Sequence, residues 1–221
     1  MHLGLDHVFS FGSEDGHEAA ALEAGGFTLR PPGRHPGQGT ANRCVAFPDT
    51  YVELIHLVAR PEAETSELRL DRRSDFAVTG HCPFGIGLRA VVPDDERKPF
   101  QAYRPPWGTP DYPPMLLHRT CLEHPGLPIV FVSQPPHGTT VDGMRPRTWR
   151  SLTPAALTHP CGATGIAAVD ITVPDARGWP IVPPPPEVTL RAGPRFHLTV
   201  RLAGSMRAPV AVAPWFTLAP A

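Results

Sequence analysis

Proline and glycine are the feature that most constrains how this chain folds. The sequence has 30 prolines and 20 glycines among 221 residues, and they follow no fixed short period, which excludes a collagen-like chain. Proline breaks helices and strand interiors, and glycine favours turns. The sequence therefore predicts a turn-rich β protein with few helices. Its length suits one large domain or two small ones, and 41% hydrophobic residues are enough for a buried core.

Charge and hydropathy exclude several classes of partner. The net charge is −1, whereas a non-specific nucleic-acid surface needs a strong basic excess. The longest apolar stretches, such as residues 127–132, fall far short of the roughly 20 residues that cross a bilayer. Residues 1–6 lack the basic and apolar regions of a signal peptide. We expect no nucleic-acid partner, no membrane association and a cytoplasmic location.

The four cysteines do not form a recognisable metal or redox motif. Cys44, Cys82, Cys121 and Cys161 have no Cys-x-x-Cys spacing, so neither a zinc knuckle nor a thioredoxin-like redox pair is indicated. We expect them to be mostly buried free thiols.

The first 60 residues predict a β-α-β-β-β unit. A strand at 5–11 is followed by helix formers that stop at Gly25 and Gly26. Two β-rich runs, 40–47 and 51–58, are separated by a short turn as in a hairpin, and 27–30 supplies a short second strand.

The rest of the chain predicts strands with little helix. Residues 62–71 form a solvated helix or linker, and 98–114 form a loop rich in proline and aromatic residues. Strands are expected at 84–92, 115–121, 127–134, 165–173, 187–192 and 195–203, with at most one more after residue 208. We interpret 1–135 as a core of two modules, 1–60 and a helix-poor 80–135, and 136–221 as a C-terminal β extension packed on that core.

A weak internal repeat supports small β modules. Strand-to-turn corners that begin at His7, Leu88 and Val169 lie 81 residues apart each time. In this register the two later positions that match His7 are apolar, and so is the region 129–131 that matches Glu53.

Several segments carry a family resemblance. They are Leu5-Asp6-His7-Val8, the stretch from Gly33 to Arg43, Tyr51-Val52-Glu53-Leu54-Ile55, residues 131–136 and residues 159–165. Together they resemble the vicinal oxygen chelate superfamily, specifically its bacterial glyoxalase-like domain proteins. The resemblance is good over 3–58, patchy to 175 and absent afterwards. Cys161 stands where that pattern usually has asparagine.

The resemblance implies an α+β fold in which paired βαβββ modules curl a mixed β-sheet into a cup around a small-molecule site. In metal-using members, the first and last strands of each module hold a divalent ion such as Fe, Mn, Ni or Zn. His7 and Glu53 occupy the two positions of the first module, which makes them the candidate metal ligands and catalytic residues. The alternative for His7 is that it only caps the Asp6 corner or hydrogen-bonds within the cup. Strand alternation places His7, Phe9 and Phe11 on one face.

The second module departs from this pattern, because it offers no equivalent ligands. The candidates for a third ligand are Gln134, His159 and His197. The alternative for His159, which precedes Pro160, is a purely structural role. Two protein ligands are fewer than the three of the known 2-His-1-carboxylate sites, so the protein could also use no metal. A homodimer could supply missing ligands from a second chain.

Other residues are candidates for binding the substrate. Arg43 either supports Glu53, because a buried carboxylate needs a cation or a donor, or binds an acidic substrate. His35 and Asn42 line the mouth of the cup or merely form a turn, and Phe9 supplies an aromatic wall. Tyr103, Trp107 and Tyr112 form a lid or simple surface cover.

Two functions follow as hypotheses. The first is an enzyme acting on a small oxygen-bearing organic molecule, as a metal-assisted lyase, isomerase or oxygenase, or with Glu53 as general base next to a carbonyl. The second is a non-catalytic protein that binds or sequesters an antibiotic or pathway intermediate. The chain has no nucleophile elbow and no phosphate-binding glycine loop.

Overall fold

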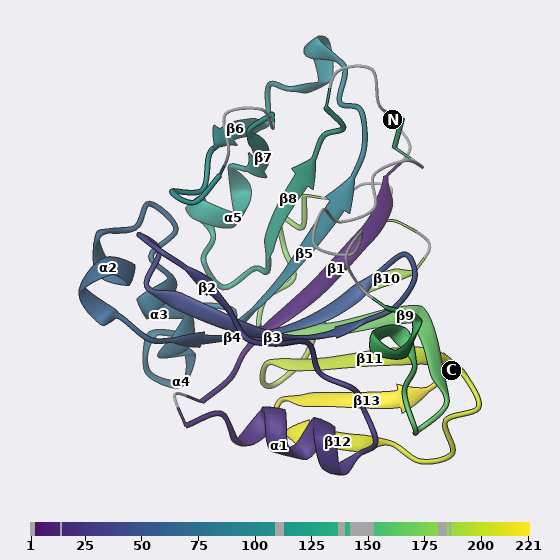
Figure 1. The fold of residues 1–221 in the computed structure, drawn as a ribbon. Coiled ribbons are helices and arrows are strands. Elements are labelled where there is room, and N and C mark those ends of the chain that lie inside the picture. The colour runs from purple at the N-terminus through teal and green to yellow at the C-terminus, as the bar shows by residue number, and fades with distance from the viewer. Residues whose placement is uncertain are drawn as a thin grey trace.

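The fold consists of two open, mixed β-sheets with few helices (Figure 1). The computed structural model describes residues 3–13, 15–108, 113–136, 140–141, 153–180, 185 and 187–221. We call the eight-stranded sheet sheet A and the five-stranded sheet sheet B. The predicted α+β, helix-poor class is confirmed.

The first module has the predicted β-α-β-β-β order. Its elements are β1 (Gly4–Phe11), α1 (His17–Ala24), β2 (Gly33–His35), β3 (Thr40–Ala46) and β4 (Tyr51–Leu57). The helix ends where predicted, because Gly26 adopts φ 81°, a left-handed conformation that suits glycine. The prediction of a second strand at 27–30 is wrong: only Leu29 forms a bridge there, and β2 lies after the two prolines.

The second module repeats the strand order without a comparable helix. It contains β5 (Phe84–Arg89), η1 (Asp94–Glu96), β6 (Phe100–Tyr103), β7 (Met115–His118), α5 (Thr120–Glu123) and β8 (Ile129–Ser133). The short 3-10 helix η1 stands where α1 stands in the first module, so the prediction of a helix-poor second module is confirmed. Three short helices join the modules: α2 (Arg60–Thr65), α3 (Leu70–Ser74) and α4 (Phe76–Thr79).

Sheet A has mirrored halves. Its strand order is β2-β3-β4-β1-β5-β8-β7-β6, with β1 and β5 antiparallel at the centre. Each central strand has a parallel neighbour on its outer side, β4 beside β1 and β8 beside β5. This order is that of two paired βαβββ modules, as the family resemblance implied.

The strand pairing corrects the register of the internal repeat. His7 lies opposite Gly87, whereas Leu88 lies opposite Leu5. A shift of one residue sends a side chain to the other face of a sheet. Leu88 accordingly packs in the core between the sheets, and the residue beside His7 is a glycine. The 81-residue register is therefore wrong for the second module.

Sheet B comes from the C-terminal part of the chain, after the short 3-10 helix η3 (Pro154–Leu157). Its strands are β9 (Ala163–Val173), β10 (Val188–Ala192), β11 (His197–Gly204), β12 (Val210–Ala213) and β13 (Phe216–Pro220), in the order β10-β9-β11-β13-β12. The region after residue 208 thus forms two strands rather than at most one. One buried cluster joins the sheets through side chains such as Val8, Ile86, Val169 and Leu198. The division of the chain at residue 136 stays a prediction.

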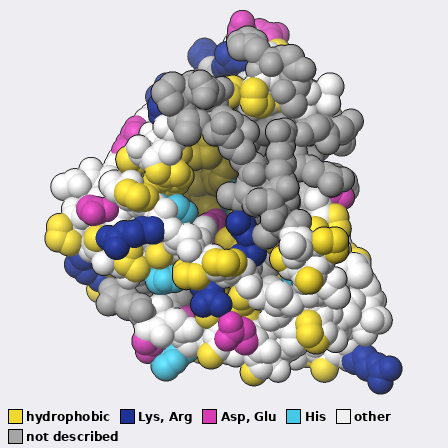
Figure 2. Space-filling view, in the orientation of Figure 1, with side chains coloured by type: hydrophobic (Ala, Val, Ile, Leu, Met, Phe, Trp, Pro, Cys, Tyr) yellow, Lys and Arg dark blue, Asp and Glu magenta, His cyan; other side chains and the backbone are white. Residues whose placement is uncertain are grey.

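The other face of sheet A is concave. Figure 2 shows a hollow in the region where Figure 1 draws β8 and β5, with hydrophobic side chains on its floor and histidine and acidic side chains at its lower margin. A second apolar cluster, which includes Phe9, Phe11, Ile55, Leu117 and Ile129, fills one end of this face. The sheet therefore forms the expected cup.

All four cysteines are free, and Cys44, Cys82 and Cys121 are buried, as expected. Within the described residues, no helix combines the length and apolar character needed to cross a membrane.

Candidate functional site

Neighbouring strands bring His7 and Glu53 together on the concave face of sheet A. In the parallel pairing of β1 with β4, His7 lies opposite Tyr51, and Phe9 lies opposite Glu53. Because alternate residues of a strand share a face, all four side chains point to the same side of the sheet. The predicted alternation of His7, Phe9 and Phe11 is confirmed by this pairing and by the second apolar cluster.

The centre of the site is a buried histidine between two carboxylates. Nε2 of His7 lies 3.6 Å from Oε2 of Glu53, and Nδ1 of His7 lies 2.7 Å from Oδ1 of Asp6. The side chains of His7 and Glu53 are 7% and 8% exposed. The Nδ2 amide of Asn42 donates to Oε1 of Glu53. Each side chain is thus held by a neighbour at one polar atom, Nδ1 of His7 and Oε1 of Glu53. The remaining atoms, Nε2 of His7 and Oε2 of Glu53, face each other.

A β-bulge places Asp6 in this cluster. The β1–β5 pairing runs from Leu5 opposite Leu88 directly to His7 opposite Gly87, which leaves Asp6 as an extra residue. Oδ2 of Asp6 then lies 3.2 Å from Nε of Arg89, and Arg89 Nη2 donates to the carbonyl oxygens of Leu5 and Asp49. Arg89 therefore clamps Asp6 from the side opposite His7.

Aromatic rings enclose the histidine. The ring of Tyr51 stacks on His7 with centroids 4.1 Å apart, and the ring of Phe131 lies 5.3 Å away, tilted by 57°. Burial, and then the charges of Glu53 and Asp6, raise the pKa of the Tyr51 phenol well above its ordinary value. Cys44, opposite Glu53 in β3, has a raised thiol pKa for the same two reasons, burial and the Glu53 charge. Both groups stay neutral at physiological pH.

Two glycines make room for the site. A Cβ atom on Gly87 would lie 2.4 Å from Cε1 of His7, and one on Gly85 would lie 2.1 Å from Cζ of Phe9. These distances are too short for any side chain. Gly85 and Gly87 therefore serve close packing against His7 and Phe9, as we expect for glycine within a strand.

His35 and Asn42 extend the cluster toward the rim of the cup. Asn42 Oδ1 accepts the Gly33 backbone N–H at 3.0 Å, so its Nδ2 faces both Glu53 and, at 3.3 Å, Nε2 of His35. His35 Nε2 lies 3.9 Å from Oε1 of Glu53, and its Nδ1 lies 2.9 Å from the Thr40 hydroxyl. Burial lowers the pKa of His35, and the charge of Glu53 opposes that shift.

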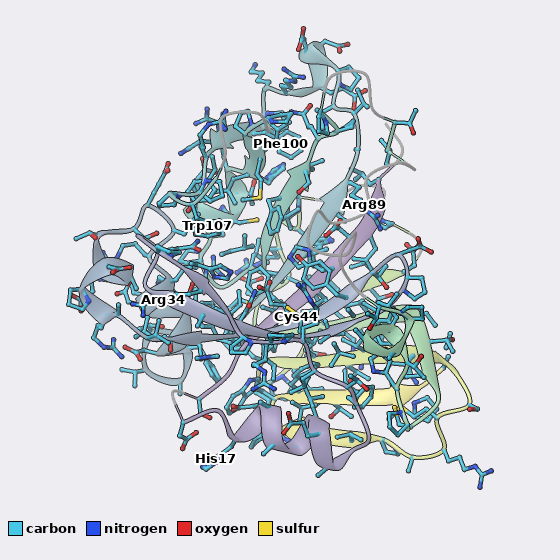
Figure 3. All side chains as sticks on the ribbon, viewed as in Figure 1. His17, Arg34, Cys44, Arg89, Phe100 and Trp107 are labelled. Atoms are coloured by element: carbon cyan, nitrogen blue, oxygen red, sulfur yellow. The ribbon has the colours of Figure 1, made fainter. Side chains whose placement is uncertain are left out.

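Trp107 covers His35. The two rings stack with centroids 4.5 Å apart at an angle of 19°, and Trp107 is 39% exposed. In Figure 3, Trp107 lies on the left and Arg89 on the right, with β8 and β5 between them. Tyr103 is buried and accepts a hydrogen bond from Gln38, and Tyr112 lies outside the described residues.

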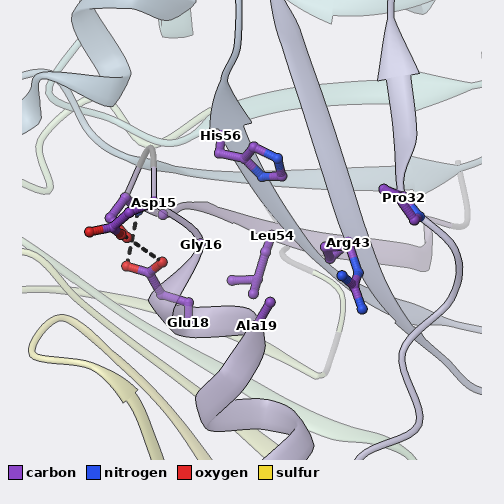
Figure 4. A pocket seen from close by; sticks show the side chains of 10 residues that line it. Asp15, Gly16, Glu18, Ala19, Pro32, Arg43, Leu54 and His56 are labelled. Atoms are coloured by element: carbon purple, nitrogen blue, oxygen red, sulfur yellow. Dashed lines mark hydrogen bonds between the residues drawn. The ribbon is translucent and has the colours of Figure 1, made fainter.

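Arg43 does not join this cluster. It lies opposite Leu54 in β3–β4, on the face away from Glu53, and its Nη2 donates to Oε1 of Glu23 at 3.0 Å. There it lines a second pocket of about 280 Å³ with Leu54, His56 and the first turn of α1 (Figure 4). The donor that Glu53 needs is Asn42, the residue before Arg43 in the sequence.

The three candidates for a third ligand lie elsewhere. Gln134 accepts a hydrogen bond from Arg97, and His197 begins β11 of sheet B. His159 is buried, with Nδ1 accepting from the Thr28 backbone N–H at 3.1 Å and Nε2 donating to the Ala46 carbonyl at 3.0 Å. Both ring nitrogens of His159 thus form hydrogen bonds with backbone groups. This corresponds to the purely structural role and not to a third metal ligand.

The described residues do not provide a complete set of ligands for a resident divalent metal. His7 Nε2 and the Glu53 carboxylate are two suitable donors, but the positions facing them from β5 and β8 are Gly87 and Phe131. No three His, Cys, Asp or Glu side chains of the described part of the chain are arranged to hold a metal ion. The set falls short of the three protein ligands of a 2-His-1-carboxylate site.

Four neighbours of the site were not among the predicted site residues: Asp6, Arg89, Tyr51 and Phe131. Tyr51 stands two residues before Glu53, so strand alternation alone could have placed it on the same face. Asp6 gives no such signal, because in a regular strand the residue next to His7 points to the opposite face. Only the bulge brings the Asp6 side chain to His7.

Comparisons with known proteins agree with this architecture. The family model described as glyoxalase-like domain matches residues 5–179. A hypothetical protein from Staphylococcus aureus is similar over 100% of both chains, with 12% identity and a TM-score of 0.57, which shows the fold alone.

Two other solved structures are less similar. Methylmalonyl-CoA epimerase from Mycobacterium tuberculosis has 15% identity and a TM-score of 0.39 over 60% of this chain and 87% of its own. A hypothetical protein from Bacillus halodurans C-125 has 10% identity and a TM-score of 0.41 over 63% and 99%. A search of curated proteins gives no match. Because the family model covers most of the sequence, the chain belongs to the glyoxalase-like domain family.

Proposed function

We propose that the protein is an enzyme that binds a small oxygen-bearing organic molecule in the cup of sheet A and exchanges a proton with it. The observation that supports this most is the 3.6 Å approach of His7 Nε2 to Glu53 Oε2 on the concave face, with each group fixed at its other polar atom. A buried pair of ionisable groups is costly unless it is used or fully bonded.

The chemistry that fits is removal of a proton from a carbon next to a carbonyl. Glu53 Oε2 or His7 Nε2 accepts the proton, and the bonding electrons move onto the carbonyl oxygen to give an enolate. Delivery of a proton to the opposite face of that carbon, as the electrons return from the oxygen, restores the carbonyl with inverted configuration and completes an isomerisation. While His7 holds the proton, Asp6 stabilises the positive charge of the imidazolium ring. The aromatic rings of Tyr51 and Phe131 limit access of water.

Hydrogen–deuterium exchange tests this proposal without knowledge of the natural substrate. A panel of 2-oxo acids, α-hydroxyketones and α-hydroxyaldehydes is incubated with the protein in D2O and followed by proton NMR. We expect exchange with at least one compound, slowed by about 10²- to 10⁴-fold in Glu53→Gln. Glu23→Gln, which changes an exposed carboxylate on the other face, is the matched control. Equal rates in Glu53→Gln and the native protein would contradict the proposal.

Metal-assisted lyase, isomerase or oxygenase chemistry is the finer alternative within the enzyme class. Asp6 behind His7 favours it, because metal-binding histidines usually donate their second N–H to a carboxylate. Near-stoichiometric Fe, Mn, Ni or Zn in protein purified without tag or chelator, lost in both His7→Ala and Glu53→Ala, would assign this alternative. A homodimer that completes the ligand set stays a prediction, as does a cytoplasmic location.

Binding without catalysis is the second candidate function. The apolar half of the cup favours it, because Ile129 and Phe131 of β8 contribute apolar side chains and no reactive group. Saturable binding of a panel compound with no exchange in the native protein would support this function over the enzyme.

A further inference from the structure

Asp6 contacts Nδ1 of His7, the ring nitrogen that does not face Glu53. It is displaced from the regular strand by a bulge, is only 8% exposed, and touches both His7 and Arg89. Bulges near active sites commonly re-aim a side chain. The two contacts of Asp6 use different oxygens, Oδ1 for His7 and Oδ2 for Arg89.

These contacts determine where the hydrogen of His7 lies. An ionised carboxylate only accepts hydrogen bonds, so the 2.7 Å contact of Oδ1 with Nδ1 requires the hydrogen on Nδ1. In the neutral ring, Nε2 then carries the lone pair, and Nε2 is the atom that faces Glu53 and the cup. With the opposite tautomer, two acceptors would meet at 2.7 Å.

We propose that Asp6, clamped by Arg89, is a positioning residue that fixes His7 as the Nδ1–H tautomer, so that Nε2 presents its lone pair to the cup and can accept a proton there. The proposal deepens the proposed function, on which its catalytic meaning rests. Its structural content, the tautomer of one buried ring, can be measured separately from any activity.

The clamp makes Asp6→Asn a sharp test. Arginine only donates, so the single amide oxygen of an asparagine at this position is drawn to Nε of Arg89. Its NH₂ group then faces Nδ1 of His7 and donates to it, which forces the hydrogen of the neutral ring onto Nε2. The substitution keeps the shape of the side chain and reverses its hydrogen-bond polarity.

The measurement is two-bond proton–nitrogen correlation NMR of the protein labelled with ¹⁵N in histidine, recorded under alkaline conditions where the imidazoles are neutral. His7→Gln assigns the signal. We expect Nδ1–H in the native protein and Nε2–H in Asp6→Asn. Asp170→Asn is the matched control, because Asp170 Oδ2 also binds an arginine Nε, at 2.9 Å in sheet B, and it should leave His7 unchanged.

The outcomes separate the proposal from the proposed function. A native ring with Nε2–H overturns the proposal by itself, even if Asp6→Asn does not fold. An unchanged tautomer in folded Asp6→Asn also overturns it. If the protein catalyses the exchange described above, Asp6→Asn should slow it by about 10²- to 10⁴-fold. If it catalyses none, the tautomer result still decides the role of Asp6.

Discussion

Sheets A and B are built on the same central arrangement but use it differently. In each, an antiparallel pair lies at the centre and each member has a parallel partner: β4-β1-β5-β8 in sheet A and β10-β9-β11-β13 in sheet B. Each central pair also carries an Asp–Arg ion pair. The side chains of Asp6 and Arg89 are 11% and 12% exposed, whereas those of Asp170 and Arg201 are 26% and 48% exposed.

The difference shows that the strand arrangement alone does not make a site. In β9, Val169, Ile171 and Val173 are fully buried against sheet A, and the alternate residues Asp170 and Thr172 are only half-buried. In β1, the concave face is enclosed as well, so His7 and Asp6 are buried on the side away from sheet B. In an enclosed ion pair, removal of one partner leaves the other charge buried and unpaired, whereas in a surface pair water solvates the remaining charge.

Removing the arginine of each pair should give the largest contrast. Arg89→Leu leaves the buried Asp6 carboxylate without its cation, and we expect it to lower the free energy of unfolding by about 3–5 kcal/mol. Arg201→Leu should cost at most about 1 kcal/mol, because its pair is exposed to solvent. Urea unfolding of both variants measures the two values, and similar losses would show that enclosure does not distinguish the sheets.

Adding a methyl group to one strand glycine in each sheet tests the packing side of the comparison. A Cβ on Gly85 meets the Phe9 ring at 2.1 Å, whereas a Cβ on Gly165 of β9 meets nothing within 4 Å. We expect Gly85→Ala to destabilise the protein by about 1–3 kcal/mol and Gly165→Ala to be neutral or slightly stabilising.

The midpoints of thermal or urea unfolding check both glycine variants. A Gly85→Ala protein as stable as the native one would mean that Phe9 can move aside, and the concave face would then be less tightly packed than the structure indicates.

The parts of the fold predicted from sequence are those that depend on neighbouring residues. Alternating apolar residues and turn chemistry placed β1, α1, β3 and β4, and alternation alone put His7 and Phe9 on one face. Arg43 was misplaced because its face depends on the register of the β3–β4 hairpin, in which Asn42 and Cys44 share the side of Glu53.

The features that sequence reasoning missed depend on long-range contacts. The bulge at Asp6 exists only in the pairing of β1 with β5, and its partner Arg89 is 83 positions away. His159 binds Thr28 and Ala46, more than 100 positions earlier. No local pattern encodes such contacts, so a family motif can mark His159 without showing whether it binds a ligand or the backbone.

The smallest expected effect concerns this histidine, which fastens the segment before sheet B onto β3 of sheet A. Burial lowers the pKa of His159 below its ordinary value near 6.5. The unfolded chain therefore takes up this proton at a higher pH than the folded protein does. The stability that neutral His159 contributes is full above about pH 6.5 and is lost as the pH falls through the folded pKa, by at most about 1.4 kcal/mol per pH unit.

His159→Gln should flatten this acid-side loss. A glutamine amide can still accept from the Thr28 N–H and donate to the Ala46 carbonyl, but it takes up no proton. Urea unfolding between pH 5 and 8 measures the slope, with His17→Gln, on an exposed side chain, as the control for the substitution itself. Part of the slope should persist, because burial also lowers the pKa of His35 within sheet A. A slope identical to that of the native protein would mean that His159 stays neutral and bonded throughout this range, so that acid does not loosen the junction of the two sheets.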